Sequence, residues 1–295
     1  MNRTVTLLGA AAAPAIWGST YLVTTETLPQ GFPLMTGLLR ALPAGLVLLV
    51  LVRCLPPRQW LGRLLVLGSL NFALFWSLLF VAAYRLPGGI AATLGATQPL
   101  MVLLLAQLML GEPLRLTDAL MAAMGLAGVA LLLAEPAIVP DSWGVVAALG
   151  GAGSMAMGSV LTRRWRPPVT PLVFTAWQLT AGGMILLPIA LLLEPNFPQP
   201  TWRNLAGYGW LGGIGAALTY YLWFRGIDRF GPAIVTTFGF LSPLSAVLLG
   251  WFFLGQQLSL IQWLGVGLIL FSVLSGQLRS RCSARRVATT ADEAK

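Results

Sequence analysis

Hydrophobic residues run through this chain in long stretches that short polar breaks separate. Most stretches are about 20 residues long, which is the length of a helix that crosses a bilayer. They are near-continuous rather than alternating, so helices are favoured over the strands of a membrane barrel. The breaks carry turn or charge signals, for example Gly111-Glu112-Pro113. The pattern predicts an all-α polytopic membrane protein with ten spans, over residues 5–25, 33–54, 61–84, 88–110, 117–134, 142–162, 170–193, 204–227, 231–254 and 258–277.

Part of this pattern occurs twice. Residues 80–110 align without a gap with residues 224–254, at a constant offset of 144. Weaker matches at offsets of 140 and 138 relate the first two spans to the sixth and seventh. Each repeat therefore contains five spans, and since five is odd, the second repeat must be inverted in the membrane. The matched pairs include Thr93 with Thr237, Pro99 with Pro243, Gly18 with Gly158, Pro33 with Pro171 and Gly45 with Gly183.

Inverted repeats around a midplane cavity are the architecture of alternating-access transporters. The sequence thus predicts one five-helix repeat over residues 1–137 and an inverted one over residues 138–277, with a central cavity between them. Residues 278–295 are polar and charged, and we expect them to form a short disordered tail.

Basic residues in the breaks orient the chain. With the N-terminus in the cytosol, fifteen basic residues face inward, and only Arg85 and Arg203 face outward. This asymmetry satisfies the positive-inside rule, so both termini are predicted to be cytosolic. The inward set is Arg3, Arg53, Arg58, Arg63, Arg115, Arg163, Arg164, Arg166, Arg225, Arg229, Arg279, Arg281, Arg285, Arg286 and Lys295.

Composition excludes several classes of protein. Charged residues make up 9% of the chain and hydrophobic residues 57%, whereas an average protein carries about 25% charged residues. The net charge of +9 does not indicate a nucleic-acid partner, because the basic residues lie between apolar runs. With no histidine and two isolated cysteines, we expect no metal site and no cofactor. The expected partners are a lipid bilayer and a small-molecule substrate, and no oligomer is required.

Several short motifs follow the same order as in a known superfamily. They are Trp17-Gly18-Ser19-Thr20-Tyr21, Leu39-Arg40-Ala41, Gln98-Pro99, Leu110-Gly111-Glu112-Pro113 and Gly125-Leu126-Ala127-Gly128. In these motifs the chain resembles the drug/metabolite transporter superfamily, in particular its EamA-like ten-span exporters. The tryptophan-rich opening is most similar to the YddG-type aromatic amino acid exporters. One departure is Gln256, which stands where the first repeat has Glu112.

The resemblance implies a bacterial inner-membrane exporter of small amphipathic metabolites. It also implies ten helices and a central cavity framed by spans 1, 3, 4, 6, 8 and 9. An amino acid needs polar partners for its two charged ends and a slot for its body. The hydroxyls, amide and aromatic rings of these spans suit such a substrate. The candidate substrate-binding residues are Trp17, Thr20, Tyr21, Asn71, Phe75, Thr93, Thr97, Met101, Tyr220, Trp223, Thr237 and Phe240. The alternative is that the hydroxyls bond to their own helices and the rings mark the membrane interface.

Three further features are candidates for structural or mechanical roles. Pro99 and Pro243 occupy equivalent mid-span positions and are either hinges or static kinks. Arg40 is a formal charge inside a span, and it either meets a substrate carboxylate, caps backbone carbonyls or pairs with a loop acid near a helix end. Small residues in spans 5 and 10 predict that these two spans pack together and join the halves. The small residues are Ala119, Ala123, Ala127, Gly265, Ser272 and Gly276.

The sequence offers no obvious energy source. It lacks a phosphate-binding loop, and its acidic residues lie at loops, span ends or the tail. We therefore favour facilitated diffusion over proton exchange. Other substrates of the same superfamily, cationic drugs or sugar phosphates, remain alternatives. An intramembrane enzyme is disfavoured, because the chain has no histidine and its single lysine is at the C-terminus.

Overall fold

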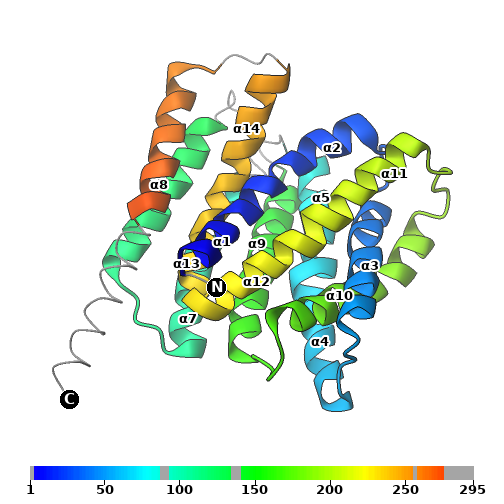
Figure 1. Ribbon diagram of the computed structural model, residues 1–295. Helices are drawn as coiled ribbons and strands as arrows, with labels where there is room; N and C mark the ends of the chain where they lie inside the picture. The colour runs from blue at the N-terminus through cyan, green and yellow to red at the C-terminus, as the bar shows by residue number, and fades with distance from the viewer. Residues whose placement is uncertain (1–2, 87–92, 134–140, 255–257, 276–295) are drawn as a thin grey trace, which may run out of the picture.

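The computed structural model describes residues 3–86, 93–133, 141–254 and 258–275 (Figure 1). Every regular element in these ranges is helical. Seven helices are long and apolar enough to cross a membrane, and two shorter apolar helices are Leu116–Leu132 and Leu260–Ser275. Together with the helical stretch over residues 202–230, they form the ten spans that the hydrophobic pattern predicted. The predicted tail, 278–295, lies outside the described residues.

The first repeat is built from interrupted helices. Span 1 is α1 followed by α2, span 2 is α3, and span 3 is a continuous run through η1, α4, η2 and α5. Span 4 ends with α7, and span 5 is α8. The elements are α1 (Arg3–Trp17), α2 (Ser19–Thr27), α3 (Pro33–Val52), η1 (Arg58–Trp60), α4 (Leu61–Gly68), the π-helix η2 (Ser69–Ala73), α5 (Leu74–Arg85), α7 (Gln98–Leu110) and α8 (Leu116–Leu132).

The second repeat follows the same plan. Span 6 is α9, span 7 is α10, span 8 runs through α11, η3 and α12, and span 9 runs through α13, η4 and α14. Span 10 is the helix Leu260–Ser275. The elements are α9 (Ser142–Arg164), α10 (Pro171–Leu193), α11 (Trp202–Gly209), the π-helix η3 (Trp210–Leu218), α12 (Thr219–Phe230), α13 (Pro232–Thr236), η4 (Thr237–Phe240) and α14 (Leu241–Leu254).

The first helix of each repeat packs against the other repeat. Helix α1 contacts α12 and α14, which belong to spans 8 and 9. Helix α9 contacts α5 and α7, which belong to spans 3 and 4. Because spans 1, 3 and 4 correspond to spans 6, 8 and 9, each contact has an equivalent in the other half. This exchange produces a pseudo-twofold arrangement of two interlocked, inverted repeats.

The contact between α3 and α10 shows the same symmetry at the level of single residues. A Cβ atom on Gly45 would lie 2.5 Å from the backbone nitrogen of Thr180, and one on Gly183 would lie 2.7 Å from the Cα of Leu42. At the offset of 138, Gly45 corresponds to Gly183 and Leu42 to Thr180. Each glycine therefore meets the equivalent of the residue that the other one meets. Only glycine permits this close approach, and the pseudo-twofold axis passes through the contact.

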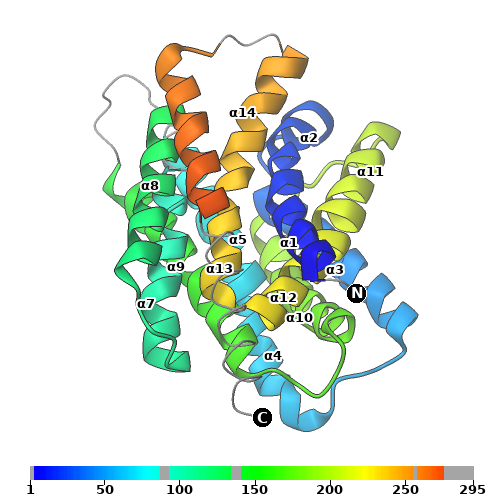
Figure 2. The ribbon, with the colours of Figure 1, turned by 60° about the vertical axis from the view of Figure 1, so that its left-hand side comes forward.

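Spans 5 and 10 form a second reciprocal contact, as the sequence predicted. Figure 2 shows the helix Leu260–Ser275 (orange to red) beside α8. A Cβ on Gly128 would lie 2.9 Å from the carbonyl oxygen of Gly265, and one on Gly265 would lie 2.6 Å from that of Gly128. The predicted face of span 5 was wrong, however, because Ala123 and Ala127 are exposed. The contact with span 10 instead involves Gly128, which allows closer approach than alanine, and the carbonyl oxygen of Met121, which accepts from Ser272 Oγ at 2.6 Å.

Helical irregularities recur at equivalent positions. The π-helix η2, shifted by 144, falls within the longer π-helix η3, so spans 3 and 8 carry the same defect. Spans 4 and 9 also share a break. Residues 96–97 form a turn just before Pro99, and the 3-10 helix η4 lies just before Pro243. Since proline lacks a backbone N–H, the preceding turn loses a helical hydrogen bond at this point.

Candidate functional site

An aromatic cluster occupies the junction between the two repeats. Its ring contacts join span 1 to spans 3 and 8. The centroid of Trp17 lies 4.9 Å from that of Tyr220 and 5.1 Å from that of Trp223. Phe72 of the π-helix η2 lies 4.7 Å from Tyr220. The aromatic cluster comprises Trp17, Phe72, Trp76, Tyr220, Trp223 and Phe224, and all but the half-buried Trp17 are buried.

One backbone carbonyl organises the polar groups around the cluster. The oxygen of Gly215, in the π-helix η3, accepts from Trp17 Nε1 at 3.2 Å, Arg40 Nη2 at 2.8 Å and Thr219 Oγ1 at 2.8 Å. The Arg40 guanidinium also lies 5.1 Å from the ring centroid of Trp76. A carbonyl and an aromatic face thus stabilise the charge that the sequence placed inside a span. Of the roles expected for Arg40, the structure shows the contact with a backbone carbonyl.

A second polar group is the amide triad of Asn71, Thr162 and Gln178. Asn71 Nδ2 donates to Gln178 Oε1 at 2.9 Å and to Thr162 Oγ1 at 3.2 Å. The triad joins spans 3, 6 and 7, and its side chains are buried. Gly158 leaves the space that Asn71 fills, because a Cβ there would overlap the Asn71 amide. Among the described residues, Asn71 Oδ1 and Gln178 Nε2 are buried without a hydrogen-bond partner.

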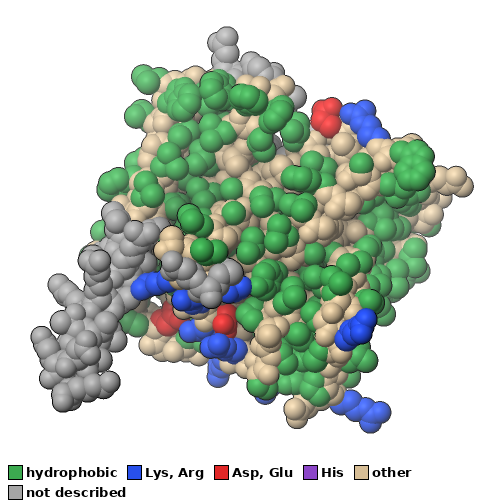
Figure 3. Space-filling view, in the orientation of Figure 1, with side chains coloured by type: hydrophobic (Ala, Val, Ile, Leu, Met, Phe, Trp, Pro, Cys, Tyr) green, Lys and Arg blue, Asp and Glu red, His purple; other side chains and the backbone are tan. Residues whose placement is uncertain are grey.

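A basic vestibule opens at one end of the molecule, beside the triad. Its volume is about 640 Å³, and its walls come from the end of α9, the segment between α9 and α10, the start of α10 and one side of α12. Figure 3 shows that basic side chains on this face gather in the lower half, below a broad hydrophobic surface. The residues that line the vestibule are Arg163, Arg166, Thr170, Pro171, Tyr221, Arg225, Asp228 and Arg229.

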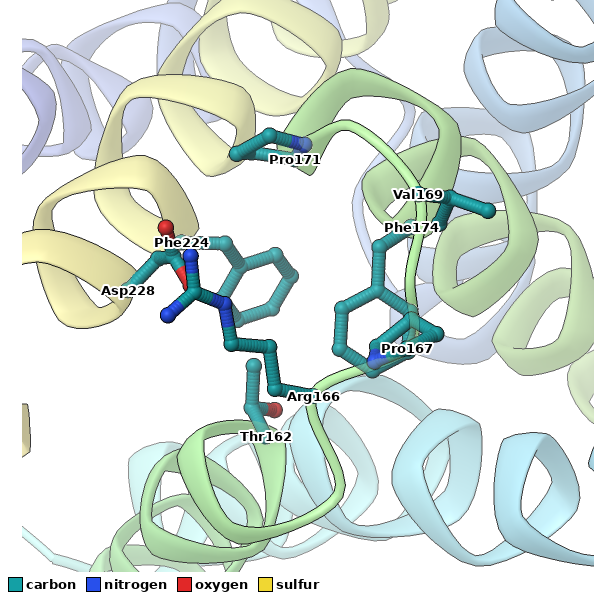
Figure 4. A pocket seen from close by; sticks show the side chains of 8 residues that line it. All are labelled: Thr162, Arg166, Pro167, Val169, Pro171, Phe174, Phe224 and Asp228. Atoms are coloured by element: carbon teal, nitrogen blue, oxygen red, sulfur yellow. The ribbon is translucent and has the colours of Figure 1, made fainter.

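An ion pair separates the vestibule from a smaller inner crevice. Arg166 Nε pairs with Asp228 Oδ1, and Arg163 Nη1 lies 4.0 Å from the same oxygen. Figure 4 shows the Arg166 side chain reaching toward Asp228, with the rings of Phe174 and Phe224 beside it. The inner crevice is lined by Thr162, Arg166, Pro167, Val169, Pro171, Phe174, Phe224 and Asp228. It therefore reaches one member of the amide triad, Thr162, and one ring of the aromatic cluster, Phe224.

A partly buried carboxylate lies near this end of the molecule. Glu112 follows α7, and a Cβ on Gly231 would lie 3.1 Å from its Oε1. Burial raises the pKa of Glu112, while the charge of Arg163 opposes this rise. Gly231 has a φ of +84°, so glycine suits the tight connection between α12 and α13 that passes this carboxylate. Glu112 thus links spans 4, 6 and 9 through charge and close packing.

The structure brings some of the predicted site residues together and separates others. Trp17, Tyr220 and Trp223 meet in the aromatic cluster, whereas Asn71 lies in the amide triad. Thr97 and Thr237 donate to carbonyls three residues earlier in their own helices. Their hydroxyls therefore follow the alternative that the sequence left open.

The other candidates lie away from the aromatic cluster and the amide triad, or at their margins. Phe240 contacts Gly125 of span 5, and the Met101 sulfur lies 3.8 Å from where a Cβ on Gly153 would stand. Phe75 packs at the edge of the main core. Thr20 and Thr93 are half-buried, and the side chain of Tyr21 lies outside the described part.

Sequence reasoning missed the residues of the vestibule and two members of the triad. Arg163, Arg166 and Arg225 were interpreted only as topology signals, although their spacing puts them near two helix ends that meet. Gln178 carried a usable signal, because an amide in the interior of span 7 needs a buried partner. Thr162 gave no such signal, because a hydroxyl group near a helix end can bond to the backbone of its own helix and needs no distant partner.

Comparisons with known proteins agree with the fold and the repeat. The chain matches the EamA-like transporter family twice, over residues 4–134 and 142–275. It is 46% identical to the protein PecM of Dickeya dadantii over 276 residues, which cover 93% of each chain. It is 32% identical to the uncharacterized inner membrane transporter YedA of Escherichia coli, covering 88% of this chain and 86% of YedA.

A solved crystal structure shares the fold with a TM-score of 0.82 at 23% identity, covering 95% of this chain and 99% of the other. The ten spans, the inverted repeats and the family match point to the same conclusion. The chain belongs to the EamA-like transporter family, within the drug/metabolite transporter superfamily, and is a multi-pass membrane transporter.

Proposed function

We propose that this transporter exports small amphipathic metabolites, and that its substrates are aromatic or neutral amino acids. The supporting observation is the aromatic cluster at the junction of the repeats. Rings from spans 1, 3 and 8 provide flat apolar surfaces for the body of such a substrate. Trp223 Nε1 is buried in this cluster without an acceptor among the described residues, so it is a donor available to a substrate oxygen. In this respect the site is of the kind expected for the YddG-type exporters.

Alternating access fits the interlocked repeats. The proposed moving units are residues 1–137 and 138–277. The α-helices of spans 4 and 9 are interrupted at equivalent positions, a few residues before Pro99 and Pro243, so each repeat has a point where half a span can pivot. A test is Pro99→Ala, which is expected to slow transport more than it lowers the folded yield. An unchanged uptake rate in proteoliposomes would exclude a hinge at this position.

We propose that the basic vestibule faces the cytosol and that the protein lies in the bacterial inner membrane with both termini inside. The positive-inside rule supports this orientation, because α9 and α12 both have arginines in their last turns at this end. In this orientation, the Glu26–Arg203 pair faces outward. A substrate arriving from the cytosol then meets the vestibule first, the inner crevice second and the aromatic cluster last.

Transport without a proton-carrying acid is the mechanism that we propose. The described carboxylates all lie at helix ends or between helices, and none belongs to the aromatic cluster or the amide triad. A membrane-embedded acid is the usual carrier in proton exchangers. The substrate's own gradient is therefore the proposed driving force.

The experiment is a panel of labelled solutes in proteoliposomes, with and without a pH gradient. Aromatic and neutral amino acids are expected to move down their gradients, and the pH gradient alone is expected to produce no accumulation. Trp223→Phe keeps a ring and removes the free donor, so it is expected to slow amino acid transport. Trp143→Phe is the matched control, because Trp143 is 71% exposed at the start of α9. Selective transport of cationic dyes would refute the proposal.

A further inference from the structure

The vestibule combines open volume with unbalanced positive charge. Four of its lining residues are arginines, and Asp228 is the one acid among them. Glu112 adds a second negative charge near Arg163. These six side chains therefore carry four positive charges and at most two negative ones. A volume of about 640 Å³ is within the range of pockets that hold small organic ligands.

Two of the arginines have close polar partners: Arg166 pairs with Asp228, and Arg225 with Tyr221. Arg225 Nη1 donates to the Tyr221 hydroxyl at 2.6 Å, which fixes its guanidinium at the wall of the vestibule. Arg163 Nη1 is buried and has no hydrogen-bond acceptor in the part of the chain that the structure describes. Its distance of 4.0 Å from Asp228 exceeds that of a hydrogen bond. A buried guanidinium N–H without an acceptor is costly, and an anion in the vestibule would supply one.

We propose that the vestibule is a binding site for the anionic group of a metabolite, a carboxylate or a phosphate, held by Arg163 and Arg225. Guanidinium groups recognise both oxyanions through charge-assisted hydrogen bonds. The site lies outside the aromatic cluster, so it selects solutes by charge before the cluster selects them by shape. The inference rests on the proposed function only for the direction from which the solute enters. The same chemistry is present in an anionic lipid headgroup, which is the other possible source of the ligand.

The test measures binding to the purified, full-length protein in phosphatidylcholine nanodiscs, by calorimetry. Indole-3-acetate and tryptamine are the probes, because they share a ring system and carry opposite charges. Indole-3-acetate is expected to bind and tryptamine not to bind. Arg163→Gln or Arg225→Gln is expected to raise the dissociation constant of indole-3-acetate by roughly tenfold, since each removes one charge-assisted contact.

Arg164→Gln is the matched control. Arg164 is adjacent to Arg163 in α9 and loses the same charge, but it is exposed and does not line the vestibule. Equal losses in Arg163→Gln and Arg164→Gln would overturn the proposal, because they would indicate a general surface potential. Equal binding of the two probes would overturn it too. If Arg163→Gln fails to fold, Arg225→Gln decides the outcome.

Nanodiscs with added phosphatidylglycerol identify the source of the anion. Unchanged affinity for indole-3-acetate supports a soluble metabolite. Competition that Arg225→Gln abolishes supports the anion site and assigns it to a lipid headgroup. The result is separable from the transport assay. Amino acid transport without charge-selective binding would refute only the vestibule site, and charge-selective binding without amino acid transport would refute only the proposed substrate.

Discussion

Removing the charge of Asp228 is expected to open the inner crevice. Asp228→Asn keeps the size of the side chain but ends its ion pair with Arg166 and its attraction to Arg163. These contacts connect the last turns of α12 to the end of α9 and the segment that follows it. Thr162 also lines the crevice, and its side chain lies next to that of Arg166 (Figure 4). With the pair broken, this position becomes accessible from the vestibule more often.

The expected size of the effect of Asp228→Asn follows from how exposed Asp228 and Arg166 are to water. The Asp228 side chain is 26% exposed and that of Arg166 is 61% exposed, so water screens much of their attraction. Measured ion pairs of this kind contribute about 0.2–1 kcal/mol. Asp228 also faces Arg163, which puts the effect near the upper limit. About 1 kcal/mol corresponds to roughly a fivefold shift between closed and open forms.

A thiol-labelling rate measures this shift. In a chain with Cys54 and Cys282 replaced by serine, Thr162→Cys reports the access of a polar maleimide to the crevice. Asp228→Asn is expected to raise the rate about fivefold. Asp141→Asn is the control, because it breaks an ion pair with Arg85 at the opposite end. An unchanged rate in Asp228→Asn, or an equal rise in the control, would show that this pair does not close the crevice.

Three further predictions concern stability. Gly45→Ala and Gly183→Ala are each expected to lower the free energy of unfolding by about 1–3 kcal/mol, measured by denaturant titration in detergent, because α3 and α10 must separate. Gly62→Ala, which has open space around it, should not destabilise the protein. Glu112 has a pKa raised by burial, so the folded state holds its proton more tightly than the unfolded state does. The free energy of unfolding should therefore fall as pH rises from about 4.5 through the raised pKa, and Glu112→Gln should remove this slope in thermal melts at several pH values. Trp17→Phe keeps the ring and removes an indole N–H with two acceptors, which should cost about 1–3 kcal/mol in the same titration.

The spans and their repeat were predictable because hydrophobic length and sequence offset are properties of the chain alone. The π-helices were not. A π-helix holds one extra residue in a helical turn, which changes the backbone carbonyl that is left free. The hydrophobic run in the sequence continues unbroken through this turn and gives no sign of it. The role of Gly215 as an acceptor for Trp17 and Arg40 therefore became visible only with the structure.

The site was predicted in part. Aromatic residues in spans 1 and 8 were identified as candidates, and Trp17, Tyr220 and Trp223 are in contact. Residues with hydroxyl groups were harder to assign. Thr97, for example, donates to a carbonyl close by in its own span, and the sequence does not distinguish such a hydroxyl from one that binds a ligand. The vestibule was missed for a different reason. The positive-inside rule requires an arginine near the end of a helix but does not specify the side of the helix on which it lies. Arg163 lies near Asp228 because α9 packs against α12, and this packing is not visible in the sequence.

The reciprocal glycine contacts between α3 and α10 have a further consequence. Each repeat offers the other an equivalent surface, so the interface is arranged like the isologous interface of a symmetric homodimer. Two separate five-helix chains of opposite orientation would make the same pair of contacts without any covalent link. The covalent link between spans 5 and 6 then keeps the two repeats close to each other, but it does not determine how their surfaces pair. A gene that encoded one such repeat would specify both sides of the interface, so a single substitution in it would change both sides at once.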